Sequence, residues 1–136
     1  MSVRFIDTNI LLYTISARAN EQTKRKTAIE LLIPMSWFCS AQVLQEFYSN
    51  AVKAPNNISK EAADALVERF APRAVVATDA ALVQQAIRIS QRHQLSYWDG
   101  AIVAAAVRCG ADELLSEDLN AGQVIEGVIV VNPFGQ

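Results

Sequence analysis

Cysteine and histidine are scarce in this chain, and their scarcity excludes several kinds of site. Two cysteines occur among 136 residues, Cys39 and Cys109, far apart and without CxxC spacing. They therefore suggest neither a disulfide framework nor a zinc site, and we expect buried thiols in a reducing compartment. The single histidine, His93, is expected at the exposed end of a helix. A histidine-based catalytic mechanism is therefore disfavoured.

Long apolar runs and a strong net charge are also missing. No run reaches the roughly 18 apolar residues of a membrane helix, and no signal-peptide pattern opens the chain. Hydrophobic residues make up 51% and charged residues 19%, which is ample for one core in a chain of this length. The formal net charge of −2 does not indicate nucleic-acid binding by itself. We predict a single cytoplasmic domain over residues 1–136, with no membrane partner.

Short apolar segments alternate with helical patterns along the chain. Serines at 40, 59 and 96 stand where they can cap helices that carry apolar residues at helical spacing. Short apolar strands separated by helices are typical of parallel pairing with helices on both sheet faces. The pattern predicts a three-layer α/β/α fold with a central parallel five-stranded sheet. The five expected strands cover residues 3–6, 37–39, 74–77, 113–116 and 128–131.

Four acids recur near the carboxyl ends of the predicted strands. Asp7 directly follows the first strand and Asp118 follows the fourth, while Glu46 and Asp99 lie on helices near their starts. In open α/β sheets these positions meet at one edge, where ligands bind. Four carboxylates brought together would repel one another unless a cation is bound. The sequence therefore suggests a metal-dependent enzyme.

Each acid taken alone has a simpler interpretation. Asp7 can cap the helix that follows it. Asp99 lies three residues after Ser96 and can complete a capping box, although aspartate is short for that reach. Glu46 can simply face solvent. A buried, unpaired Asp99 on an almost wholly apolar helix would be costly, and a metal ion would remove that cost.

The acid after the fourth strand is ambiguous by pattern. Glu117 and Asp118 are neighbours, and alternation from buried Leu115 leaves either one available to the site. Ser116 could hydrogen-bond a carboxylate or a metal-bound water. Each of these simple interpretations can account for one acid. Together they do not explain why every acid stands at or just beyond the end of a strand.

Four segments in order give the chain a family resemblance. They read FIDTNIL from residue 5, QEF from 45, YWDGAI from 97 and LLSEDLxxG from 114. This arrangement resembles the PIN-domain family, in particular VapC-type toxins of bacterial and archaeal toxin–antitoxin pairs. It spans residues 5–122, essentially the whole chain. The resemblance implies a parallel five-stranded sheet between helices, in agreement with the fold predicted above.

The resemblance also implies roles for particular residues. The acidic positions of the family fall on Asp7, Glu46, Asp99 and Asp118 as the catalytic set. Of these, Asp7, Asp99 and Asp118 would hold one or two Mg²⁺ or Mn²⁺ ions, and Glu46 would orient the attacking water or share the metal. Supporting positions around the carboxylates or the water are expected at Thr8, Asn9 and Ser116.

One position departs from the family pattern. Gly100 stands where alanine is commoner after the third acid. We expect this to remove only a methyl group and to leave metal ligation undisturbed.

The implied function is a metal-dependent endoribonuclease, the toxin of a type II toxin–antitoxin system. Its partners would be an RNA substrate, a cognate antitoxin and a second copy of the chain in a homodimer. Basic residues from 18 to 26 could meet phosphates, or could form a solvated helix face. The alternative function is a non-catalytic PIN-like module that binds RNA or protein.

Two other aspartate-based enzyme classes fit poorly. A dehalogenase-type phosphatase needs a second acid two residues after the first, and that position is Asn9. A receiver domain needs a lysine late in the chain, and no lysine follows Lys60.

Overall fold

The computed structural model describes residues 2–135 and has a mixed six-stranded sheet at its centre. The order across the sheet is β3-β2-β1-β4-β6-β5, and all pairings are parallel except that of β5 with β6. The predicted α/β class and the five expected strands are therefore confirmed. The strands are β1 (Arg4–Ile6), β2 (Trp37–Ser40), β3 (Ala74–Val76), β4 (Glu113–Leu115), β5 (Val124–Ile125) and β6 (Val128–Val131).

The sixth strand, β5, has no counterpart in the sequence prediction. It contains two residues, of which Val124 is exposed, so it shows neither an apolar run nor an alternating pattern. Glu126 and Gly127 connect it to β6, both with positive φ (52° and 84°). Two successive residues with positive φ are typical of the tightest antiparallel hairpins. The usual Asn-Gly signal for such a turn is absent here.

The helices begin where the sequence offers caps. Side-chain oxygens of Ser40, Ser59, Asp79 and Ser96 accept backbone N–H groups at the starts of α3, α4, α5 and α6. The main helices are α1 (Thr8–Tyr13), α2 (Gln22–Leu32), α3 (Ala41–Ala51), α4 (Lys60–Phe70), α5 (Ala80–His93) and α6 (Tyr97–Arg108), with single 3₁₀ turns at Ala19–Glu21 and Ala71–Arg73.

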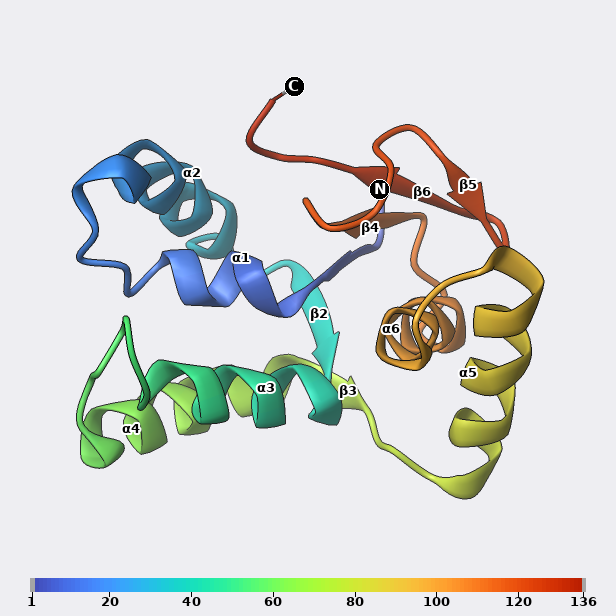
Figure 1. Cartoon of the computed structure of the whole chain (residues 1–136), viewed down its shortest axis with the longest axis horizontal. Helices are drawn as coiled ribbons and strands as arrows, with labels where there is room; N and C mark the ends of the chain where they lie inside the picture. Colours follow the sequence, from blue (N-terminus) through green and yellow to red (C-terminus); the bar gives the residue numbers. More distant parts are fainter. Residues whose placement is uncertain (1, 136) are drawn as a thin grey trace.

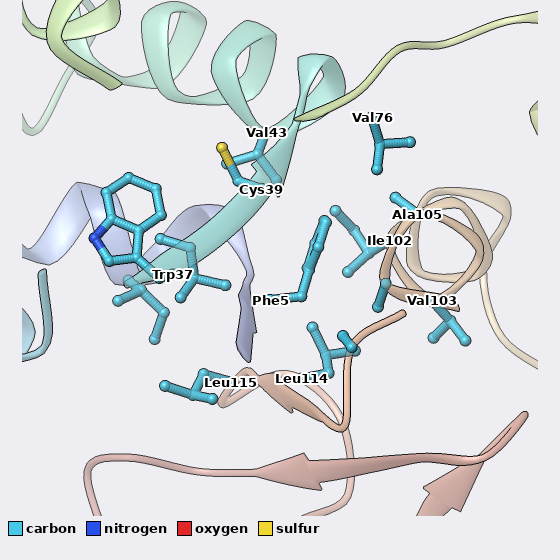
Figure 2. Packing of buried hydrophobic residues seen from close by; sticks show 14 of the residues in the cluster. Phe5, Trp37, Cys39, Val43, Val76, Ile102, Val103, Ala105, Leu114 and Leu115 are labelled. Atoms are coloured by element: carbon cyan, nitrogen blue, oxygen red, sulfur yellow. The ribbon is translucent and has the colours of Figure 1, made fainter. Parts of the chain in front are cut away.

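The helices form two layers with the sheet between them. Helix α6 lies against β2, β4 and β6, and α5 packs on α6; α1 to α4 occupy the other side (Figure 1). Every residue from Ala101 to Ala106 is buried, as an inner helix requires. Figure 2 shows Phe5 and Leu114 beside Ile102 in this core. No helix in the described part of the chain is both long and apolar enough to cross a membrane.

Gly100 has a role that the sequence prediction missed. A Cβ built on this residue would lie 2.7 Å from the backbone oxygen of Ala86 and 2.8 Å from Cβ of Ser90, both on α5. Alanine there would push the two helices apart. The expectation that the glycine merely removes a methyl group is therefore incomplete, because its missing side chain permits the close approach of α5 and α6.

The cysteines agree with the prediction in part. Cys39 is fully buried on β2, whereas Cys109 is only half-buried after α6. Burial raises the pKa of the Cys39 thiol to about 12, so it stays protonated. This suits a packing role.

Candidate active site

Asp7 stands at the carboxyl end of β1, beside the end of β4. The strand register pairs Ile6 with Leu115, and the Asp7 N–H donates to the Leu115 carbonyl at 3.0 Å. Its Oδ1 accepts the Thr8 N–H at 2.7 Å, which makes Asp7 the cap of α1, and its Oδ2 accepts the Ser116 hydroxyl at 2.9 Å. Asp7 is therefore both a helix cap and a member of a cross-strand contact.

The Asp7 carboxyl is buried, and no basic side chain between residues 2 and 135 pairs with it. Only 6% of the residue is exposed, and desolvation raises its pKa from 3.8 to about 6. The hydrogen bonds from Thr8 and Ser116 oppose this rise, while the charges of Asp118 and Glu46 add to it. A positive ion at this position would relieve both the burial and the repulsion.

Glu46 is held over the same edge from α3. The Thr8 hydroxyl donates to its Oε1 at 2.5 Å, and the Gln42 amide donates to its Oε2 at 3.1 Å. The same Gln42 nitrogen lies 3.3 Å from the Trp98 carbonyl oxygen, at the start of α6. Glu46 therefore does not simply face solvent. Gln42 was not singled out from the sequence, although its place one turn before Glu46 was a usable signal.

Asp118, which follows β4, and Asp99, in the first turn of α6, complete the set of four acids. The Asn9 amide donates to Oδ2 of Asp118 at 2.9 Å, and the Asp118 N–H donates to the Ser116 hydroxyl at 3.1 Å. Desolvation raises the pKa of Asp118, and the Asp99 charge is the next largest cause. The Asp99 N–H donates to the Ser96 hydroxyl at 3.1 Å, which confirms the serine cap at this helix start.

Glu117 and Asp118 have different surroundings. Glu117 accepts a hydrogen bond from the Tyr13 hydroxyl and forms an ion pair with Lys24 at 2.8 Å. Asp118 instead bonds to Asn9, the second residue after Asp7. Neither Tyr13 nor Lys24 was predicted to hold Glu117, since such a contact between distant segments leaves no local pattern.

The four acids share two properties. Among residues 2–135, none of them forms a salt bridge, although six other ion pairs are present. Their charges also act on one another. Asp118 and Glu46 raise the pKa of Asp7, and Asp99 and Glu46 raise the pKa of Asp118. The structure thus brings all four to one edge of the sheet, as the sequence suggested.

The donor set suits a hard divalent cation, because it consists of carboxylate, hydroxyl and amide oxygens. In the described conformation, no three acidic, histidine or cysteine side chains between residues 2 and 135 are gathered closely enough to hold an ion. Three of the carboxylates instead accept hydrogen bonds from the residues predicted to support them: Glu46 from Thr8, Asp118 from Asn9 and Asp7 from Ser116.

The chain is thus an α/β domain with unpaired acids at the carboxyl edge of its sheet, where open α/β folds bind their ligands. The sequence profile of the PIN domain matches residues 4–125, so the chain belongs to the PIN-domain family. The match includes all four acids. A search of curated proteins finds no relative of this sequence.

Three solved structures with this fold are similar to the chain over most of its length. A toxin–antitoxin complex from Klebsiella pneumoniae superposes with a TM-score of 0.71 at 20% identity, covering 98% of this chain and 99% of that one. FitAcB from Neisseria gonorrhoeae gives 0.63 at 20% identity, covering 97% and 99%. VapC20 from Mycobacterium tuberculosis, named as a Sarcin-Ricin loop cleaving toxin, gives 0.62 at 21% identity, covering 82% and 86%.

Proposed function

We propose that this protein is a metal-dependent endoribonuclease that acts in the cytoplasm as the toxin of a type II toxin–antitoxin pair. The observation that carries the proposal is the buried Asp7 carboxyl, which has a raised pKa, forms no salt bridge with any residue between 2 and 135, and lies within reach of the charges of Asp118 and Glu46. Membership of the PIN-domain family supports the same chemistry.

Asp7, Asp99 and Asp118 would hold one or two Mg²⁺ or Mn²⁺ ions. A bound divalent ion supplies an acidified water and a Lewis acid for phosphodiester hydrolysis. The choice of Asp118 over Glu117 is supported by the ion pair that engages Glu117 with Lys24. The Ser116 hydroxyl fixes one oxygen of Asp7, and the Asn9 amide fixes one oxygen of Asp118.

Glu46 would orient the attacking water or share the metal. Thr8 and Gln42 each hold one of its carboxylate oxygens, so its orientation is set from two sides. A water oxygen adds to phosphorus as the P–O3′ bond breaks. Glu46 can accept the proton that the water loses, and the departing 3′-oxygen takes up a proton from solvent. Hydrolysis in this form requires no histidine.

Surface features support protein partners. An apolar groove of about 460 Å³ lies between α1, α2 and α4, with Ile15, Leu32 and Phe70 among its walls. Ile33, also in the groove, is 70% exposed. Large exposed apolar patches mark interaction sites, and an antitoxin or a second copy of the chain would remove this surface from water.

The decisive experiment is RNA cleavage by the purified chain with and without Mg²⁺ or Mn²⁺. We expect cleavage of single-stranded RNA that is abolished by EDTA and lost in Asp7→Asn and Asp99→Asn. Asp79→Asn is the matched control, because Asp79 is an acid paired with Arg108 outside the site. RNA binding without cleavage in either metal would favour the non-catalytic alternative.

The partner assignment needs a separate test. Co-expression with the product of the neighbouring upstream gene should yield a stable complex in which RNA cleavage is suppressed. Light scattering of the free chain would report whether it forms a dimer.

A further inference from the structure

A small polar pocket opens beside the acidic residues and has no role in the function proposed above. It measures about 180 Å³ and lies between the α1 segment and the connection that follows α3. Its walls include Asn9 and Tyr13 on α1, Arg18 before α2, and Pro55 and Asn56 after α3. This volume is below the roughly 300 Å³ of pockets for drug-sized ligands, which limits the occupant to a group about the size of one nucleobase.

Two wall residues connect the pocket to the candidate active site. Asn9 lines the pocket and also donates to Oδ2 of Asp118 at 2.9 Å. Tyr13, one helical turn further along α1, lines the pocket and donates to Glu117. An occupant would therefore contact the two side chains that hold the acids after β4.

The two asparagines offer both hydrogen-bond donors and acceptors. Among the hydrogen bonds of residues 2–135, Asn9 uses one N–H for Asp118, and Asn56 uses one N–H for the Asn50 carbonyl at 3.1 Å. An asparagine amide carries two N–H groups and a carbonyl oxygen, so each retains a donor and an acceptor. Such mixed pairs match the edges of unpaired bases, which proteins read in single-stranded RNA.

Arg18 supplies positive charge at the pocket, which the acidic residue Glu21 also lines. Its guanidinium pairs with Glu21 at 3.2 Å, and its side chain is 52% exposed. An exposed pair of this kind is weak. Guanidinium binds phosphate with two parallel hydrogen bonds, so a phosphate can replace Glu21 as its partner.

We propose that this pocket binds one nucleotide of a single-stranded RNA, directly beside the phosphodiester that is cut. Its base lies against Asn9 and Asn56, and its phosphate pairs with Arg18. The assignment of RNA as the ligand rests on the proposed function, but the binding step itself requires no cleavage.

The first test measures binding of short, fluorescently labelled, random-sequence single-stranded RNA in EDTA, over a series of salt concentrations. Each phosphate contact to a single strand contributes about 0.7 to the slope of log affinity against log salt. Arg18→Gln should reduce the slope by about that amount and weaken binding. Arg88→Gln removes the same charge from an exposed position on α5 and should leave the slope unchanged. Equal slopes in both variants would overturn the phosphate contact.

The second test follows the side-chain amides of ¹⁵N-labelled protein by NMR while AMP, GMP, CMP or UMP is added. The Asn9 and Asn56 amide signals should shift with at least one mononucleotide, while that of Gln94, exposed at the far end of α5, should not. No shift with any of the four would overturn the base contact. Because the protein is unaltered, misfolding cannot confuse this result.

The two proposals fail in different ways. RNA binding that depends on Arg18, without metal-dependent cleavage, would contradict the endoribonuclease and preserve the nucleotide pocket. Cleavage by the parent, with unresponsive Asn9 and Asn56 amides and equal salt slopes, would contradict the pocket and preserve the endoribonuclease.

Discussion

Acids at the carboxyl edge of the sheet differ from acids elsewhere in the molecule. Asp79 pairs with Arg108 at 2.9 Å, and Glu126 contacts both Arg92 and His93 at 2.7 Å. Hydrogen bonds from these partners lower the pKa of both acids. Within the described residues 2–135, Asp7 and Asp118 form no salt bridge, and desolvation raises their pKa.

The difference separates two uses of a carboxylate. A paired surface acid is electrostatically satisfied within the fold and contributes little to stability. A buried, unpaired acid among other acids destabilises the isolated fold, and such groups gather at functional sites. On this basis the sheet edge, rather than the ion-paired surface, is where a cation is expected.

The largest expected effect is on catalysis. Asp99→Asn should lower the RNA cleavage rate roughly a hundredfold or more, because it removes a negative ligand from the metal position. Initial rates on a labelled single-stranded RNA would measure this loss. Asp79→Asn should cleave at nearly the parent rate, and comparable losses in both variants would remove the distinction between the two kinds of acid.

Stability without metal should depend on pH through Asp7. The folded protein holds the Asp7 proton more tightly than the unfolded chain does, so stability falls as pH rises from 3.8 through about 6. The rise from 3.8 to about 6 corresponds to at most about 3 kcal/mol. Urea unfolding in EDTA should show this dependence in the parent and a weaker one in Asp7→Asn.

The ion-paired acids should change stability with pH in the opposite direction to Asp7. Asp79 and Glu126 have lowered pKa values, so their contribution is present at neutral pH and is lost as pH falls. Identical pH profiles for the parent and Asp7→Asn would contradict the raised pKa of Asp7.

Divalent ions should stabilise the parent more than Asp7→Asn. An ion at a hundred times its dissociation constant adds about 2.7 kcal/mol to the stability of a protein that binds it only when folded. Thermal unfolding with and without Mg²⁺ would measure the gain, and Asp79→Asn should show the full parent effect. Equal gains in the parent and Asp7→Asn would count against Asp7 as a ligand.

A smaller effect is expected from Gly100→Ala, which tests the close packing of α6 against α5. The added methyl group would meet Ala86 and Ser90 on α5, and overpacking of this kind costs about 1–3 kcal/mol. Urea unfolding would measure the loss. Adding Gly100→Ala to a Ser90→Gly background should cost less stability than adding it to the parent. Ser90→Gly removes the Cβ of Ser90, one of the two atoms closest to the new methyl group. Unchanged stability in Gly100→Ala would show that the helices separate without penalty.

The sequence predicted most of the fold because its signals are local. Ser40, Ser59 and Ser96 cap the expected helices, since a cap depends only on the next few residues. Residues predicted at the site also come together: Thr8 contacts Glu46, and Asn9 contacts Asp118. Their catalytic and metal-binding roles stay predictions.

Other features of the site depend on contacts between distant segments. Lys24 pairs with Glu117, 93 residues further along the chain. The neighbouring acid, Asp118, contacts Asn9 instead. Nothing in the local pattern of those residues could decide between the two acids. The close approach at Gly100 likewise depends on where α5 lies.

The amino-acid sequence by itself determined the alternation of strands and helices, the helix caps and the placement of Asp7 where β1 ends. Those properties follow from backbone propensity and from hydrogen bonds within a few residues. The tertiary structure alone decided which acids remain without a basic partner and which side chains orient them. Only packing fixes how far each carboxylate is removed from water and which charges lie near it.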